Sequence, residues 1–262
     1  MPFTLAHPAA VLPLRRLRLL RTVPLIIGAM TPDAPYYLPW RIAKHIPDVT
    51  HTLLGTFTVD LPVGMLLLLC AWLLRAPLAA PLGPRARAKC ASAMERFGSR
   101  PRNWALAPLS ILIGAWTHIA WDSFTHADGW MVQRIPALSA PVSFFSYTGQ
   151  LCHVLQYACS VFGLAVLAVW FALLPAPAVA NGERSSGGAG GPMLLAAIFL
   201  AAVAVGGCVT MKSVGWHLGP SYHLIYLLLT RTTAFFAAFY TLAGIIILAG
   251  RRHASAASVT QV

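Results

Sequence analysis

Acidic side chains are scarce in this sequence. Of its 262 residues, 7 are Asp or Glu and 19 are Lys or Arg, and charged residues together make up 10% of the chain. An average soluble domain has about 25% charged residues. Hydrophobic residues make up 58% of the chain, and the mean hydropathy is +0.69. This composition excludes an ordinary soluble domain and predicts a membrane protein.

The sequence also lacks a paired cysteine motif. Its cysteines are odd in number, widely spaced and without a Cys-x-x-Cys pair, which argues against a disulfide framework and against a thiolate zinc site. They are Cys70, Cys90, Cys152, Cys159 and Cys208. We interpret them as small apolar residues.

Basic residues are in surplus and give a formal net charge of +12. In a membrane protein such a surplus usually lies in loops that face the anionic cytoplasmic leaflet, so we expect no nucleic-acid partner. The connection from Arg75 to Asn103 carries seven Lys or Arg residues and one acid, Glu95, and is therefore predicted to be cytoplasmic. This orientation places Phe124 at the outer end of the apolar run that follows.

Five apolar runs are long enough to cross a bilayer, which takes about 20 helical residues. They are Leu53 to Leu74, Ala105 to Phe124, Leu151 to Leu174, Met193 to Met211 and Leu224 to Ala249. Two shorter runs before residue 31, with four arginines between them, predict an interfacial or broken helix. We therefore expect an all-α polytopic membrane protein with five to six transmembrane helices.

The spans and their connections predict one membrane-embedded helical domain over residues 1–250. Its basic cytoplasmic loop is expected at 75–104. The Gly-, Ser- and Ala-rich stretch 176–192 has the composition of a flexible linker. Residues 251–262 are expected to form a polar tail.

Ionisable residues gather at the end of the run that begins at Ala105. Such residues are costly at membrane depth, so they predict a functional site. His118 and Asp122 are four residues apart, which places both on one face of a helix, and His126 follows after another four. Imidazole and carboxylate ligands without a thiolate suit zinc, manganese or iron. The structural alternative for His118 and Asp122 is a hydrogen bond between helices.

Three further positions are candidates for substrate contacts or catalysis. Asp60 lies in an apolar run, where an unpaired carboxylate is unfavourable, and we interpret it as a general base or as a group that orients a metal-bound water. Arg231 could hold an anionic substrate group such as phosphate, or could instead neutralise Asp60. His217 and His223 are left open between a loop role and a second metal or substrate contact.

Four short motifs lie in order along the first half of the chain. They are M-P-F-T-L-A-H-P-A at residues 1–9, I-G-A-M-T-P-D-A-P-Y at 27–36, H-T-L-L-G at 51–55 and G-A-W-T-H-I-A-W-D-S-F-T-H at 114–126. Together they resemble a bacterial membrane family known as domain of unknown function 4184. More remotely, the pattern is similar to the membrane-bound metal-dependent hydrolases and to the helical zinc-dependent phospholipase C group.

The resemblance implies a divalent metal, zinc before manganese or iron, held by separate helices in a bacterial cell membrane. The matching positions are His7, Asp33, His51, His118, Asp122 and His126. It also implies hydrolysis of an ester or phosphoester, with membrane lipid as a candidate substrate. The alternative is a non-catalytic membrane protein whose metal-binding or polar cluster serves assembly or transport.

Overall fold

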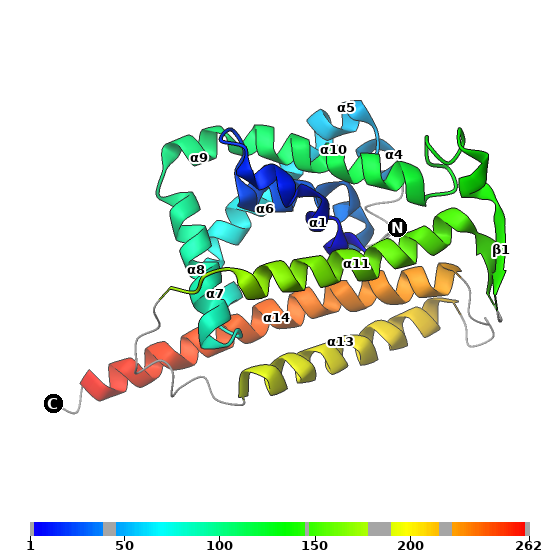
Figure 1. Ribbon diagram of the computed structural model, residues 1–262. Coiled ribbons are helices and arrows are strands. Elements are labelled where there is room, and N and C mark those ends of the chain that lie inside the picture. Colours follow the sequence, from blue (N-terminus) through cyan, green and yellow to red (C-terminus); the bar gives the residue numbers. More distant parts are fainter. Residues whose placement is uncertain (1–2, 39–45, 145–146, 178–189, 215–221, 260–262) are drawn as a thin grey trace. The chain divides into compact units, whose positions relative to one another are not determined.

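The structure is a computed structural model, and it describes residues 3–38, 46–144, 147–177, 190–214 and 222–259 (Figure 1). These residues are mostly helical, which confirms the all-α fold. They also include a short β-hairpin in which β1 (Pro141–Phe144) pairs antiparallel with β2 (Tyr147–Gln150). Within the predicted single domain the chain forms two compact units, Met1–Leu69 with Phe97–Leu174 and Cys70–Arg96 with Pro175–Val262.

Four helices are long and apolar enough to cross a membrane, which supports the prediction of a membrane protein. Their apolar parts are Leu53–Leu73, Leu151–Leu173, Gly191–Val214 and Leu224–Arg251, in agreement with four of the predicted runs. The fifth run forms helix α10 (Ala107–Thr125) but is not one of these four, because polar side chains such as His118 and Asp122 lower its hydropathy. The predicted count of five to six spans is therefore not confirmed.

The first unit contains most of the short helices. Besides α10 it holds η1 (Thr4–Ala6), α1 (Pro8–Val11), η2 (Pro13–Arg16), α2 (Thr22–Gly28), η3 (Thr31–Tyr37), α4 (Ile46–Thr50), α5 (Leu53–Gly55), η4 (Thr56–Asp60), α9 (Pro101–Ala105), η5 (Pro136–Ser139) and α11 (Leu151–Leu173). The five elements before residue 38 have at most seven residues each, too few to cross a bilayer. Their position at a membrane interface stays a prediction.

Helix α10 is the centre of the first unit. Pro108 suits the start of this helix, because proline lacks an N–H and the N–H groups of the first turn have no hydrogen-bond partner within the helix. Helices α1, α2 and α11 and the turn η4 contact it (Figure 1). Its buried residues recur every three or four positions and so form one face: Ala107, Ser110, Ile111, Gly114, Ala115, His118, Asp122 and Thr125.

Two glycines allow α2 to lie directly against α10. A Cβ atom on Gly28 would be 2.2 Å from the carbonyl oxygen of Ile111, and one on Gly114 would be 2.4 Å from that of Leu25. Because the two backbones approach so closely, Ala29 at the end of α2 comes within hydrogen-bond distance of His118 on α10.

Asp60 ends a π-helical turn, η4, in the long helical segment that begins at Leu53 and continues into α6 (Leu61–Leu73). Turns of this kind are rare and often occur at functional sites. The turn contacts α10, and Asp60 is fully buried. The fold therefore brings a carboxylate from an apolar helix into the interior of the first unit.

The second unit is built from α7 (Arg75–Ala79), most of α8 (Pro84–Gly98), α13 (Gly190–Val214) and α14 (Tyr222–Val259). Helices α13 and α14 lie side by side (Figure 1). Gly206 permits this contact, since a Cβ there would be 2.9 Å from the backbone nitrogen of Thr232. Helix α14 also contacts α7, where the Tyr240 hydroxyl donates a hydrogen bond of 2.7 Å to the carbonyl of Leu78.

The predicted connections differ in detail from the structure. The basic segment 75–104 is mostly helical and comprises α7, α8 and most of α9, with short turns between them. The predicted linker 176–192 falls mainly on residues 178–189, which lie outside the described residues. Helix α14 continues through the predicted polar tail as far as Val259.

Replacing Gly114 with Ala should destabilise the first unit, because the added Cβ would meet backbone atoms of α2 that cannot yield without shifting that helix. Overpacking of this kind typically costs about 1–3 kcal/mol of the free energy of unfolding. We expect a lower midpoint in the thermal unfolding of detergent-solubilised protein. Gly207→Ala is the control, because a Cβ at Gly207 would have nothing within 4 Å. An equal loss in both variants would contradict the close packing.

Candidate metal centre

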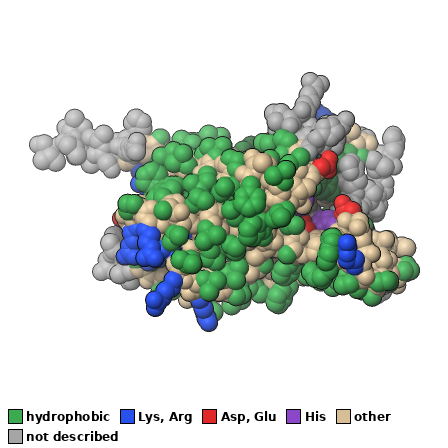
Figure 2. Space-filling view, turned by 90° about the horizontal axis from the view of Figure 1, so that it is seen from above, with side chains coloured by type: hydrophobic (Ala, Val, Ile, Leu, Met, Phe, Trp, Pro, Cys, Tyr) green, Lys and Arg blue, Asp and Glu red, His purple; other side chains and the backbone are tan. Residues whose placement is uncertain are grey.

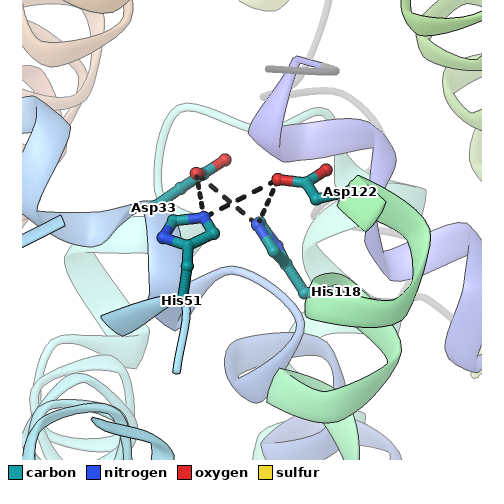
Figure 3. A group of neighbouring side chains, drawn as sticks. All are labelled: Asp33, His51, His118 and Asp122. Atoms are coloured by element: carbon teal, nitrogen blue, oxygen red, sulfur yellow. Dashed lines mark ion pairs between the residues drawn. The ribbon is translucent and has the colours of Figure 1, made fainter. Parts of the chain in front are cut away.

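Four titratable side chains converge in the first unit (Figure 3). Asp33 comes from η3, His51 directly follows α4, and His118 and Asp122 lie one turn apart on α10. One ligand atom from each residue lies within 4.8 Å of the other three. The cluster could therefore hold a metal ion, as predicted for these four positions.

Imidazole nitrogens and carboxylate oxygens alternate around a small space. Nε2 of His118 is 3.5 Å from Oδ1 of Asp33 and 3.3 Å from Oδ2 of Asp122. Nε2 of His51 is 3.6 Å from each of the same two oxygens. Figure 3 shows the two carboxylates facing the two imidazoles across this space. Imidazole nitrogen and carboxylate oxygen are ligand types that zinc, manganese and iron accept.

A backbone carbonyl fixes the orientation of the His118 ring. Nδ1 of His118 lies 2.8 Å from the carbonyl oxygen of Ala29, so this nitrogen carries the proton and donates it. Nε2 is then the atom that faces Asp33 and Asp122, buried and without a hydrogen-bond partner among the described residues. Histidines that bind metals almost always donate their second nitrogen in this way, because the bond sets both ring orientation and tautomer.

In His51, as in His118, Nδ1 is the ring nitrogen that faces a hydrogen-bond acceptor, here the hydroxyl of Thr50. The Thr50 hydroxyl donates a hydrogen bond of 2.8 Å to the carbonyl of Pro32. Its oxygen, 3.3 Å from Nδ1 of His51, can therefore act as the acceptor for that ring nitrogen. Nε2 of His51 consequently faces the two carboxylates as the atom that can bind an ion.

The Asp33 carboxylate is held by one oxygen only. Its Oδ2 accepts a hydrogen bond of 2.6 Å from the Thr4 hydroxyl, which in turn accepts one of 2.6 Å from the hydroxyl of Tyr37. The other oxygen, Oδ1, is buried and has no hydrogen-bond partner in the described part of the chain. An oxygen of this kind costs free energy unless a cation or proton reaches it.

The charges of the cluster depend on these contacts. Burial alone would lower the pKa of His51, but the neighbouring carboxylates of Asp122 and Asp33, each 3.6 Å from its Nε2, outweigh it and raise the pKa to about 9. Burial alone would raise the pKa of Asp33, but the neighbouring His118 outweighs it and holds the pKa below the usual value. At neutral pH His51 is therefore protonated in the metal-free protein, and a metal must displace that proton.

One side of the cluster is open. The side chains of His51 and His126 are 26% and 24% exposed, whereas those of Asp33 and His118 are fully buried. Figure 2 shows histidine and carboxylate surface together in a recess between groups of hydrophobic side chains. A small polar group can therefore reach the cluster from outside.

The other two predicted ligands lie beside Asp122. Nε2 of His7 is 3.4 Å from its Oδ1, and Nδ1 of His126 is 3.6 Å from its Oδ2. Burial and the neighbouring His118 lower the pKa of His7 to about 3, so this residue is neutral. Nδ1 of His126 also lies 3.1 Å from the backbone carbonyl of Asp122. Neither residue belongs to the group of four, but both contact it.

The comparison with known protein families identifies the chain. The family model described as Domain of unknown function (DUF4184) matches residues 1–248. The chain belongs to this family. No match was found among the curated proteins or the solved structures that were compared. The predicted likeness to metal-dependent hydrolases therefore stays a prediction.

Asp60 of this DUF4184 protein lies close to the cluster without belonging to it. It is fully buried, and neither carboxylate oxygen has a hydrogen-bond partner among the residues that the structure describes. It lies within electrostatic range of His51, His118 and Asp33. This surrounding is compatible with a general base or with a group that orients a ligand of the metal.

The predicted substrate contacts lie in the second unit or outside the described residues. The Arg231 guanidinium donates to the carbonyl of Val209, at 2.9 Å, and to the hydroxyl of Ser213. His223 belongs to α14, but its side chain is not described, and His217 lies outside the described residues. Their role in substrate binding stays a prediction.

Sequence analysis missed the residues that support the ligands. Thr4, Tyr37 and Thr50 hold Asp33 and His51, and the carbonyl of Ala29 holds His118. All four lie inside or next to the family motifs: Thr4 and Ala29 lie within the motifs at 1–9 and 27–36, Tyr37 directly follows the second of these, and Thr50 directly precedes His51. A polar side chain beside each ligand was the available signal. A backbone carbonyl leaves no such signal.

Replacing His118 or Asp122 with Ala should weaken metal binding at least tenfold, since even changes beyond the direct ligands typically cost 10 to 100-fold in affinity. The dissociation constant of zinc would be measured by competition with a chromogenic chelator on detergent-solubilised protein. His153→Ala, on α11, is the control and should bind zinc like the wild type. Unchanged affinity in both ligand variants would refute the site.

Proposed function

We propose that this protein is a membrane-bound hydrolase that uses a divalent metal held by Asp33, His51, His118 and Asp122 to cleave an ester or phosphoester at the membrane surface. The observation that carries the proposal is that buried oxygens of Asp33 and Asp122 face the buried Nε2 of His118, and that none of these atoms has a hydrogen-bond partner among the described residues. The nearby Asp60 carboxylate also has no such partner in this part of the chain. When bound, a divalent ion lowers the pKa of a coordinated water to about 7 and polarises the oxygen of the scissile group.

The coordination number separates this function from a structural one. Four protein ligands around a tetrahedral zinc would close the centre, as in structural zinc sites. Hydrolysis requires a fifth position, which manganese and iron adopt readily and zinc can adopt. The exposed edges of His51 and His126 provide room for that position. The closed four-ligand form supports the second candidate function, a non-catalytic metal centre that serves assembly or transport.

Asp60 supports the catalytic alternative. A carboxylate with no hydrogen-bond partner in the described residues, fully buried on a helix apolar enough to cross a membrane, is unfavourable as mere packing. Near His51 and His118 it can accept the proton of the attacking water and later return it to the leaving group. To act as this base, Asp60 must be ionised when the water attacks.

The surroundings of the opening support a lipid substrate. Val49, Leu53 and Leu54, which flank His51 in the sequence, are 43%, 67% and 72% exposed. Exposed apolar side chains beside the open edge would contact acyl chains, while the polar head of the lipid reaches the cluster. We propose that the enzyme acts at a bacterial cell membrane. The surplus of Lys and Arg in the segment 75–104 favours the cytoplasmic side for that segment.

Asp60→Asn should retain the metal and the fold but lose about 100-fold or more in turnover, the usual contribution of acid–base assistance. Turnover would be measured on a panel of phosphodiester, phospholipid and carboxylic-ester substrates, with metal content and thermal unfolding measured on the same preparations. Thr58→Val, two residues away and exposed, is the control. If wild-type protein loaded with zinc or manganese hydrolyses nothing and Asp60→Asn changes only stability, the non-catalytic function replaces the hydrolase.

The proposed orientation is tested by thiol labelling in a variant freed of native cysteines. Ser99→Cys lies in the basic segment and should react with a membrane-impermeant reagent only after the cytoplasmic side is opened. Ser139→Cys, in η5 beyond the end of α10, should react in intact cells. The reverse labelling pattern would place the candidate centre on the cytoplasmic side and overturn the orientation.

A further inference from the structure

His7 is not explained by the four-residue centre. It is 3% exposed, and both of its ring nitrogens are buried without a hydrogen-bond partner among the described residues. A buried polar group without a partner is unfavourable, so its presence in a native structure requires an explanation such as a bound ion. Its Nε2 lies 3.4 Å from Oδ1 of Asp122.

The His7 ring stacks on that of His118. The ring centroids are 3.7 Å apart and the planes are inclined by 18°. Each ring faces a different oxygen of the same carboxylate: Nε2 of His118 is 3.3 Å from Oδ2 of Asp122, and Nε2 of His7 is 3.4 Å from Oδ1. Asp122 is thus presented to two parallel imidazoles at once.

This arrangement has the dimensions of a two-metal centre. Metal ions in binuclear hydrolytic sites lie about 3.5–4 Å apart, which is close to the 3.7 Å between the stacked rings. A carboxylate can bridge two ions with its two oxygens, and Oδ1 of Asp122 is itself buried without a hydrogen-bond partner in the described chain. A simple hydrogen bond from Nε2 of His7 to Oδ1 of Asp122 would be long at 3.4 Å.

We propose that Nε2 of His7 and Oδ1 of Asp122 hold a second divalent metal ion, bridged by Asp122 to the ion in the four-residue centre. The inference rests on the metal centre of the proposed function but not on hydrolysis. With two protein ligands against four, the second ion binds more weakly than the first and keeps more of its water. The two sites therefore fill in order.

The test uses manganese(II) as the probe on the full chain in detergent. Equilibrium binding should give two manganese ions per wild-type chain, the second weaker than the first. Electron paramagnetic resonance should show an isolated-ion signal at one equivalent and an exchange-coupled signal at saturation. His7→Gln, which keeps a polar side chain, should bind one ion and show only the isolated signal. Its first-ion affinity should stay within about threefold, less than the 10 to 100-fold loss expected for a supporting residue.

Two results would overturn the inference. They are one manganese per wild-type chain, or two per His7→Gln chain. If the second result came with the first ion weakened tenfold or more, His7 would be a positioning residue for Asp122. His153→Gln is the matched control and should bind two ions. If His7→Gln fails to fold, the wild-type stoichiometry and spectrum decide alone. Wild-type protein that binds no manganese would also overturn the proposed metal centre, whereas one bound ion overturns only the second site.

Discussion

The first unit is organised around two buried carboxylates that face each other. Asp33 and Asp122 would repel strongly in an interior with little water, and they persist because positive or proton-donating groups lie between and behind them. His51 and His118 occupy the space between, and Thr4 and His7 lie behind the outer oxygens. A divalent cation would satisfy both inner oxygens at once. The elements that carry these residues must therefore be positioned so that their side chains meet.

The packing of the helices brings these side chains together. The close approach of α2 to α10, permitted by Gly28 and Gly114, places the carbonyl of Ala29 where it can hold His118. The same contact positions the start of η3, which carries Asp33. On the other side, the N-terminal turn η1 contacts α11 and supplies Thr4. Short helices, each too small to be stable alone, are thus held by contacts with two long ones.

The sequence predicted the part of the site that lies on a single helix. His118 and Asp122 follow from their spacing on one helix, because two residues four apart share a face whatever the rest of the fold does. Asp33 and His51 lie on other elements, so only the resemblance to the DUF4184 family connected them to α10, and the structure brings them together. The role of the Ala29 carbonyl could not be predicted, since it depends on the approach of two backbones. The hydropathy of the run from Ala105 to Phe124 predicted a membrane span, but its polar face is directed into the protein.

The central claim is that Asp33, His51, His118 and Asp122 form a metal centre. Anomalous diffraction from crystals of the protein soaked in zinc or manganese tests it most directly. The account predicts an anomalous peak about 2.0–2.2 Å from Nε2 of His51 and of His118 and from the facing oxygens of Asp33 and Asp122. Peaks only at other residues, such as the cysteines, would contradict it.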